Sequence, residues 1–311
     1  MKRILITGAS GFIGACLARE LAEHGDEVHL FLRNTSNLWR LNGLQDRFEI
    51  HRVDITDAEN VKAAVREIRP DIIYHLATYG AYARQKDEKS AMETNVWGTV
   101  NLLNACASVG FERFVNVSSS SEYGIKDKPM REDDVLEPNG IYGVTKATAT
   151  LYCQYMAHNK GLPITMFRVF AAYGYYEEPS RLIPSLIVPC LKNESPKLSS
   201  PDSVRDFIFV EDVIEALKRS TEVPGACGEI MNLGTGKQHT VKEAAEIVRE
   251  LTGCKKEPHW NAVEKTGEEP KKWVADMTKT ERILKWKPKH SLESGLKKTA
   301  QWFSSNMGHY E

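Results

Sequence analysis

The first half of the chain alternates short apolar runs with longer segments in which apolar residues recur every three or four positions. The short runs predict strands buried on both faces, and the longer segments predict helices with one apolar face. This alternation is typical of an α/β fold with a parallel sheet covered by helices on both sides. Strands are predicted at 2–7, 27–32, 47–53, 71–76, 113–118 and 163–169, and helices at 12–24, 58–68, 90–109 and 141–159.

After residue 170 the alternation loosens and prolines become frequent. Helices are expected near 182–192, 241–251 and 292–304, and two segments, 206–210 and 230–233, are expected to return to the main sheet as strands. The pattern as a whole predicts a doubly wound parallel sheet of the Rossmann kind with a smaller, interleaved C-terminal region that binds substrate. We assign 1–170 to the dinucleotide-binding domain, with 206–233 returning to it, and 171–205 and 234–311 to the substrate-binding region.

Composition narrows the class of protein without identifying it. The 311 residues carry a net charge of −1, so no basic excess indicates binding to nucleic acid or to a membrane surface. No apolar run approaches the roughly 20 residues that span a bilayer, and the chain enters its first strand too early to leave room for a signal peptide. The six cysteines form no CxxC pair and the histidines no metal-ligand spacing, so we expect reduced thiols, a cytoplasmic location and no metal.

A glycine-rich turn between the first strand and the first helix is the candidate nucleotide-binding element. Gly8, Gly11 and Gly14 are spaced GxxGxxG and would allow a pyrophosphate to approach the helix N-terminus, beside Phe12 and Ile13. The alternative is an ordinary tight turn. At the end of the third strand, Asp54 could accept a hydrogen bond from an adenine amine or could cap the following helix.

The end of the second strand decides which dinucleotide is preferred. A carboxylate there binds the ribose hydroxyl of NAD, whereas an arginine accommodates the phosphate of NADP. This chain has Leu32 followed by Arg33, with Thr35 and Ser36 as nearby donors. Arg33 could also be a solvated surface residue, but the missing acid favours NADP(H), with NAD(H) still possible.

The run Tyr142-Gly143-Val144-Thr145-Lys146 carries the candidate chemistry. Residues four apart lie on one face of a helix, so the ammonium of Lys146 would lie near the phenol of Tyr142 and favour the phenolate. Tyr142 could then transfer a proton near neutral pH. Upstream, a serine run from Ser118 to Ser121 stands at the carboxyl end of a predicted strand, where ligands bind in such sheets, although serine runs are usually just loops.

These three motifs, in this order, resemble the extended short-chain dehydrogenase/reductase family of NAD-dependent epimerases and dehydratases. The resemblance covers nearly the whole chain. It extends to further motifs, which are His75-Leu76-Ala77, Asn95 in TNVWGT, RVFAAYG from Arg168, RDFIFVEDV from Arg205, Asn232-Leu233-Gly234 and Trp286-Lys287-Pro288.

The resemblance implies a set of site residues. The catalytic residues would be Ser119, Tyr142 and Lys146, with cofactor contacts also at Ile55, Leu76 and Ala77, and substrate contacts at Ser120, Ser121, Arg181 and Arg205. The family's dehydratases have an Asp-Glu pair where this chain has Ser120 and Ser121, so dehydration is not expected. Glu122 is one position displaced from that pair and is interpreted as structural. The asparagine that usually contacts the diphosphate is replaced by Ala171.

Within the family, several segments resemble the 4-ketoreductases of deoxysugar pathways. The alternative is a nucleotide-sugar 4-epimerase of the UDP-glucose type, which keeps its NAD bound and usually has an acid at the position of Leu32. A less favoured alternative is a non-catalytic NADP-sensing regulator, because such proteins typically lose the Tyr–Lys pair. The resemblance also implies a nucleoside-diphosphate sugar as ligand and a homodimer formed by the helices at 90–109 and 141–159.

Overall fold

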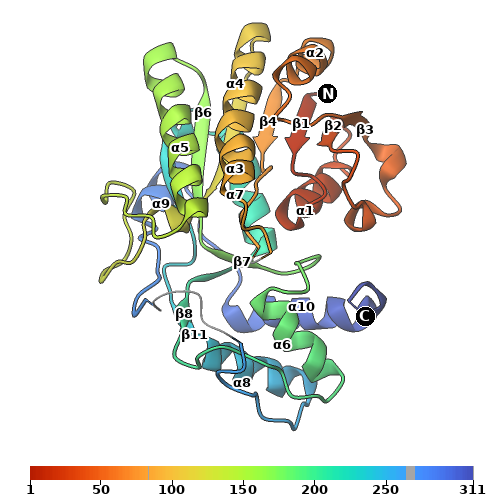
Figure 1. Ribbon diagram of the computed structural model, residues 1–311, viewed down its shortest axis with the longest axis vertical. Helices are drawn as coiled ribbons and strands as arrows, with labels where there is room; N and C mark the ends of the chain where they lie inside the picture. The colour runs from red at the N-terminus through yellow and green to blue at the C-terminus, as the bar shows by residue number, and fades with distance from the viewer. Residues whose placement is uncertain (83, 264–269, 311) are drawn as a thin grey trace.

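The computed structural model describes residues 1–82, 84–263 and 270–310, and its centre is a seven-stranded parallel sheet (Figure 1). The strands run in the order β3-β2-β1-β4-β5-β6-β10, and every neighbouring pair is parallel. Their bounds are β1 Arg3–Thr7, β2 Glu27–Leu32, β3 Glu49–Arg52, β4 Ile72–His75, β5 Arg113–Ser119, β6 Ile164–Val169 and β10 Ile230–Leu233. The order reverses between β1 and β4, which is where a doubly wound sheet binds its ligand.

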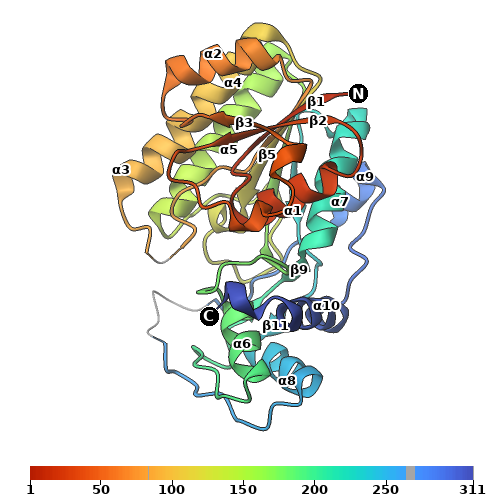
Figure 2. The same cartoon turned by 90° about the vertical axis from the view of Figure 1, so that its right-hand side faces the viewer.

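Helices cover both faces of the sheet, because successive side chains of a strand point to opposite faces and both sets are apolar here. Ile4 and Ile6 on β1 face one apolar cluster, whereas Leu5 between them faces the other. Figure 2 shows α1 and α7 on the first face and α2, α4 and α5 on the second. These helices are α1 Phe12–Leu21, α2 Ala58–Ile68, α4 Gly98–Val109, α5 Ile141–Lys160 and α7 Val210–Glu222.

The predicted helix at 90–109 is present but irregular. A short helix α3 (Glu88–Ala91) continues into a π-helical segment η3 (Met92–Trp97), which leads into α4. π-Helical turns occur mostly as single bulges, often near functional sites. This one places the side chain of Asn95 inside the protein, with 1% of its surface exposed.

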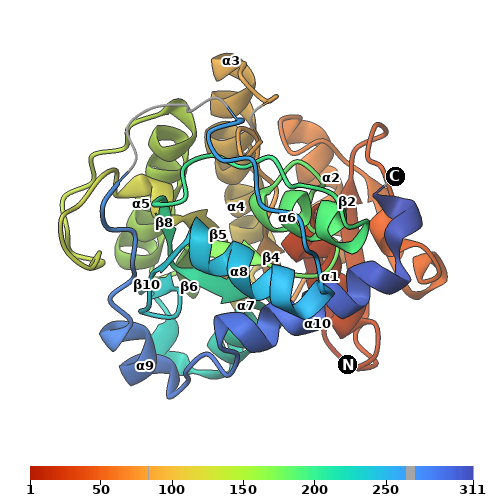
Figure 3. The same ribbon diagram turned by 90° about the horizontal axis from the view of Figure 1, so that it is seen from below.

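A smaller helical region lies below the carboxyl edge of the sheet. Figure 3 shows its three helices together on this side of the molecule. They are α6 Leu182–Leu191, α8 Val241–Thr252 and α10 Leu292–Ser305. Two short ladders join this region to the sheet domain, and they are formed by β7 Ala171–Tyr173 with β9 Phe207–Phe209 and by β8 Val204–Arg205 with β11 His239–Thr240.

The two segments that were predicted to return to the main sheet pair with different strands. Ile230–Leu233 pairs with β6 and closes the edge of the main sheet, as predicted. The segment predicted at 206–210 does not join that sheet, because Phe207–Phe209 pairs with β7 in a separate ladder. Helices α7 and α9 (Thr278–Leu284) were not predicted, although Val210, Val213, Ile214 and Leu217 have the spacing of an apolar helix face.

Candidate active site

A cavity of about 600 Å³ lies at the carboxyl edge of the sheet, between the sheet domain and the helical region. Its walls come from the turn after β1, the ends of β4, β5 and β6, the start of α5 and the segment that leads into α6. The predicted site residues that line it are Gly8, Gly11, Phe12, Ile13, Gly14, Leu76, Ser119, Ser120, Ser121, Tyr142, Lys146, Arg181 and Arg205. The fold therefore brings most of the predicted residues into one space.

The glycine-rich turn has a backbone that only glycine can supply. Gly8 has a φ of +73°, and a Cβ there would lie 2.6 Å from the backbone nitrogen of Ala77. A Cβ on Gly14 would lie 2.3 Å from the carbonyl oxygen of Gly8. The turn therefore packs tightly against its own helix and against the end of β4, and it places the first residues of α1 in the wall of the cavity. Such a cradle fits the pyrophosphate of a dinucleotide.

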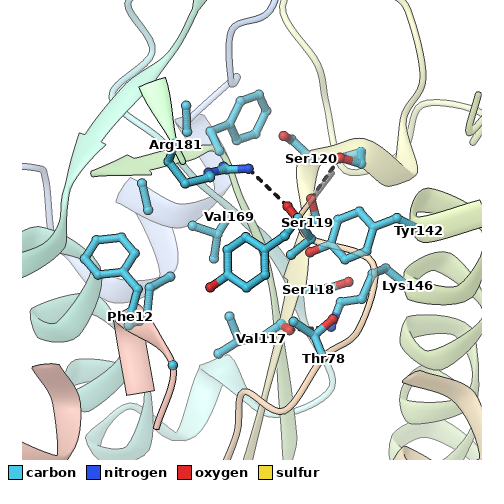
Figure 4. A pocket seen from close by; sticks show the side chains of 18 of the residues that line it. Phe12, Thr78, Val117, Ser118, Ser119, Ser120, Tyr142, Lys146, Val169 and Arg181 are labelled. Atoms are coloured by element: carbon cyan, nitrogen blue, oxygen red, sulfur yellow. Dashed lines mark hydrogen bonds between the residues drawn. The ribbon is translucent and has the colours of Figure 1, made fainter. Parts of the chain in front are cut away.

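Ser119, Tyr142 and Lys146 gather on one wall of the cavity, with Phe12 on the opposite wall (Figure 4). Ser119 ends β5, whereas Tyr142 and Lys146 lie in the first two turns of α5. The Oγ atom of Ser119 is 3.1 Å from that of Ser121 and also accepts a hydrogen bond from the backbone of Ser121 at 3.1 Å. The Nζ atom of Lys146 donates to the carbonyl oxygen of Val117 at 2.8 Å.

The pKa of Tyr142 differs from the one that the sequence predicts. Burial raises the pKa of the Tyr142 phenol above its usual value, while hydrogen bonding with Ser119 and the charge of Arg181 act in the opposite direction. Burial also lowers the pKa of Lys146 to about 8. The lowering of the Tyr142 pKa that the sequence predicts does not appear in this structure, because burial of the phenol dominates and the Lys146 ammonium is hydrogen-bonded to the carbonyl oxygen of Val117.

Glu122 lies behind the serine run and has a structural role, as interpreted from the sequence. It is fully buried, and its carboxylate accepts hydrogen bonds from Ser118, from Thr150 at 2.6 Å and from Arg168 at 2.7 Å. The Arg168 guanidinium in turn donates to the hydroxyl of Tyr123 at 3.1 Å. This network joins β5, α5 and β6 directly behind Ser119, the predicted catalytic serine.

The predicted substrate contacts line the same cavity from several elements. Trp273 donates from its indole nitrogen to Ser120 at 3.2 Å. Arg181, just before α6, donates to the carbonyl oxygen of Ala81 at 3.2 Å across the cavity. Arg205 lies on β8 and donates to the carbonyl oxygen of Val204 at 2.6 Å. Two arginines thus reach the cavity from the side of the helical region.

Four predicted cofactor residues do not line this cavity. Arg33 is exposed at the end of β2, and Asp54 is exposed at the end of β3, where its carboxylate accepts from the backbone of Thr56 at 3.0 Å. Ile55 is buried against Gly98, and the backbone of Ala77 donates to the hydroxyl of Thr7 at 3.2 Å. Their roles as cofactor contacts remain predictions.

The cavity also contains functional candidates that the sequence did not single out. Glu177, Glu178, Tyr82 and Trp273 all line it. Arg40 is buried, with 6% of its surface exposed. Its guanidinium donates to the carbonyl oxygen of Tyr176 at 2.6 Å and to that of Ser10 at 3.3 Å, so it links the segment before α6 to the glycine-rich turn. No local sequence pattern marks these residues, because their burial depends on contacts between segments that are far apart in the chain.

Within residues 1–82, 84–263 and 270–310, no three His, Cys, Asp or Glu side chains are grouped so that they could hold a metal ion. No helix in these same ranges combines the length and the apolar character needed to cross a membrane.

Comparisons with known proteins define the class. The family model described as "NAD dependent epimerase/dehydratase family" matches residues 4–234, and this chain belongs to that family. The chain is 30% identical to the UDP-glucuronate 4-epimerase of Thermodesulfobacterium geofontis, covering 99% of this chain and 98% of the relative. It is 27% identical to the dTDP-glucose 4,6-dehydratase of Shigella flexneri, covering 98% and 93%.

Solved structures of enzymes from this class superpose on nearly the full length of the chain. The UDP-glucose 4-epimerase of Thermotoga maritima with UDP-glucose superposes with a TM-score of 0.91 at 28% identity, covering 98% of this chain and 99% of that one. The UDP-glucuronic acid 4-epimerase of Bacillus cereus, in complex with UDP-glucuronic acid and NAD, gives 0.86 at 28%, also covering 98% and 99%. The protein is therefore an NAD(P)-dependent enzyme of nucleotide sugars, as predicted, with the predicted fold.

Proposed function

We propose that this enzyme is an NADPH-dependent reductase of a 4-ketosugar linked to a nucleoside diphosphate. The observation that carries the choice of cofactor is the end of β2, where Arg33 follows Leu32 and no carboxylate stands. An enzyme that consumes NADPH must exchange the dinucleotide at every turnover, whereas a 4-epimerase keeps its own. A site suited to NADP therefore favours a reductase.

The surroundings of Arg33 support this assignment. Its backbone nitrogen donates to the hydroxyl of Ser36 at 3.0 Å, and its carbonyl oxygen accepts from the guanidinium of Arg52 at 3.2 Å. Arg52 ends β3, so two cationic side chains stand at the ends of neighbouring strands. A phosphate on the adenosine ribose would find charge and hydrogen-bond donors there.

The residues around the cavity can assist such a reduction. The glycine-rich turn would hold the pyrophosphate, and bound NADPH would supply the hydride. Tyr142 would donate a proton to the oxygen at C4, and Ser119 would hold that oxygen in position. Lys146 would contact the ribose next to the nicotinamide. Once its ammonium no longer donates to the carbonyl oxygen of Val117, Lys146 would also favour ionisation of Tyr142.

A 4-epimerase is the second candidate, and the comparisons favour it. The three 4-epimerases described above match the chain along nearly its whole length, and one of them was solved with NAD. Ser119, Tyr142 and Lys146 could take up and return the proton of the C4 hydroxyl, while bound NAD would accept and return the hydride. Dehydration is not proposed, because Ser120 and Ser121 offer no acid–base pair, even though dehydratases are among the relatives.

Two properties of the whole protein are also proposed. All six cysteines are free thiols, which agrees with the reducing conditions of the cytoplasm. A homodimer is supported by large apolar side chains that are exposed along the two predicted interface helices, namely Met92, Trp97, Val144, Leu151 and Tyr155.

One assay separates the candidates. The enzyme is incubated with NADPH and several 4-keto-6-deoxy nucleotide sugars, and the loss of NADPH is followed at ~340 nm, the absorbance of the reduced nicotinamide. We expect oxidation of NADPH with at least one of them. Interconversion of UDP-hexoses at C4 without net use of cofactor would replace the reductase by the epimerase. A 4-keto-6-deoxy product from a nucleotide hexose, detected by its absorbance in alkali, would instead show a dehydratase.

A further inference from the structure

Glu177 lines the cavity and carries a buried carboxyl oxygen that has no hydrogen-bond partner among the described residues. Its side chain is 4% exposed, and its Oε2 atom has no hydrogen-bond partner among the described residues. Its Oε1 atom lies 3.8 Å from Nε of Arg181, which holds the carboxyl from one side. A buried polar atom without a partner costs about 1–3 kcal/mol, so native proteins rarely keep one without a use.

The position of Glu177 indicates which part of a ligand it would meet. It lines the main cavity together with Ser119 and Tyr142, and it also lines an adjoining cavity of about 300 Å³ that contains Arg205 but neither of those two. Glu177 therefore stands where the catalytic part of the site joins the part with the arginines. In a nucleotide sugar, the group between the reacting carbon and the diphosphate is the sugar ring.

We propose that Glu177 is a specificity-determining residue that binds a hydroxyl group of the sugar ring through its carboxyl group. A hydroxyl both donates and accepts, so it can pair with a carboxyl in either protonation state. A diphosphate oxygen only accepts, and an ionised carboxylate would repel it. Burial raises the pKa of Glu177 to about 8, although the charge of Arg181 and a hydrogen bond from the backbone of Gly174 act against this shift. This inference rests on the nucleotide-sugar substrate of the proposed function.

The binding of the sugar can be separated from that of the nucleotide. UDP-, CDP-, dTDP- and GDP-linked hexoses are titrated into wild type by calorimetry, and the tightest ligand is compared with its bare nucleoside diphosphate. We expect Glu177→Ala to weaken the nucleotide hexose by about 10- to 100-fold and the bare diphosphate by less than about threefold. Glu177→Gln keeps an acceptor and should lose less than about tenfold.

The matched control is Glu211→Gln. Glu211 accepts a hydrogen bond from the hydroxyl of Tyr175 at 2.9 Å, so this variant perturbs the same segment from behind without touching the cavity. It should bind the nucleotide hexose as wild type does. Unchanged hexose binding by both Glu177 variants, or an equal loss for the hexose and the bare diphosphate, would overturn the proposal. Normal hexose binding without reductase turnover would overturn only the proposed function, and absence of hexose binding would overturn both.

Discussion

Asn95 donates a hydrogen bond from its Nδ2 atom to the hydroxyl of Thr145, the residue before Lys146, over 2.8 Å. The same amide group donates to the carbonyl oxygen of Tyr79 at 2.8 Å and accepts from the backbone nitrogen of Tyr79 at 2.8 Å and from the hydroxyl of Thr78 at 3.1 Å. One buried side chain on the π-helical segment thus holds α5, the helix that contains Tyr142 and Lys146, to the loop that follows β4.

Replacement of Asn95 by alanine should therefore destabilise the protein by roughly 2–4 kcal/mol, because several buried groups lose their partners together. Urea unfolding followed by circular dichroism measures this change. The control is Asn104→Ala on α4, an exposed residue with one hydrogen bond, to Tyr152 at 2.8 Å. It should cost less than about 1 kcal/mol, and equal losses for the two variants would contradict the proposed role of Asn95.

Tyr142→Phe removes the acid and keeps the ring. General acid catalysis typically contributes 10²–10⁴-fold, so turnover should fall by about that factor while the dissociation constant for NADPH changes little. Lys146→Ala should reduce both turnover and cofactor affinity, because the proposed function uses this side chain for both. Steady-state kinetics and fluorescence titration with NADPH measure the two effects. A Tyr142→Phe enzyme with normal turnover would show that another group supplies the proton.

Arg33→Ala tests the preference for NADP. A charge-assisted contact with a phosphate is worth roughly 1.5–3 kcal/mol, so NADPH should bind tenfold or more weakly while NADH binding hardly changes. The control is Arg47→Ala, which removes an exposed arginine just before β3. Dissociation constants for both dinucleotides decide the question, and wild-type protein that binds NADH as tightly as NADPH would disprove the preference.

His75 should make stability depend on pH. It is buried between the hydroxyls of Thr7, at 2.7 Å, and Thr99, at 2.9 Å, and burial lowers its pKa to about 3. The pKa of this histidine in the unfolded chain is about 6.5. Below that pH the unfolded chain binds a proton on His75 and the native state does not, so the free energy of unfolding falls as pH falls. Between pH 7 and pH 5 wild type should lose about 2 kcal/mol more than His75→Gln. Urea unfolding at both pH values gives this difference, and parallel losses would contradict it.

The proposed dimer can be tested on α5. Leu151 is 53% exposed on this helix, and a Leu151→Glu substitution would place charge in the interface. We expect sedimentation velocity to show a dimer for wild type and a monomer for this variant. Val135→Glu changes an apolar side chain that is 74% exposed outside both helices, and it should leave the dimer intact. A wild-type monomer at micromolar concentration would disprove the proposal.

The local part of the site could be predicted from the sequence because its signals are short in range. The turn that contains Gly8 requires glycine for steric reasons, and the spacing of Tyr142 and Lys146 follows from helix geometry. Phe207–Phe209 was assigned to the wrong sheet, because an apolar run predicts a buried strand but not its partner. The burial of Glu177 depends on segments far apart in the chain, so no local pattern could have indicated it.

The position of β10 has a consequence for how the protein is made. This strand closes the sheet beside β6, yet it comes from residues 230–233, after part of the helical region. A nascent chain that ends near residue 170 has six of the seven strands and lacks α7, which covers one face. The edge of β6 then stays open for pairing with another chain. The seven-stranded sheet therefore cannot be completed on the ribosome until about three quarters of the protein has emerged, and a truncated fragment is expected to aggregate.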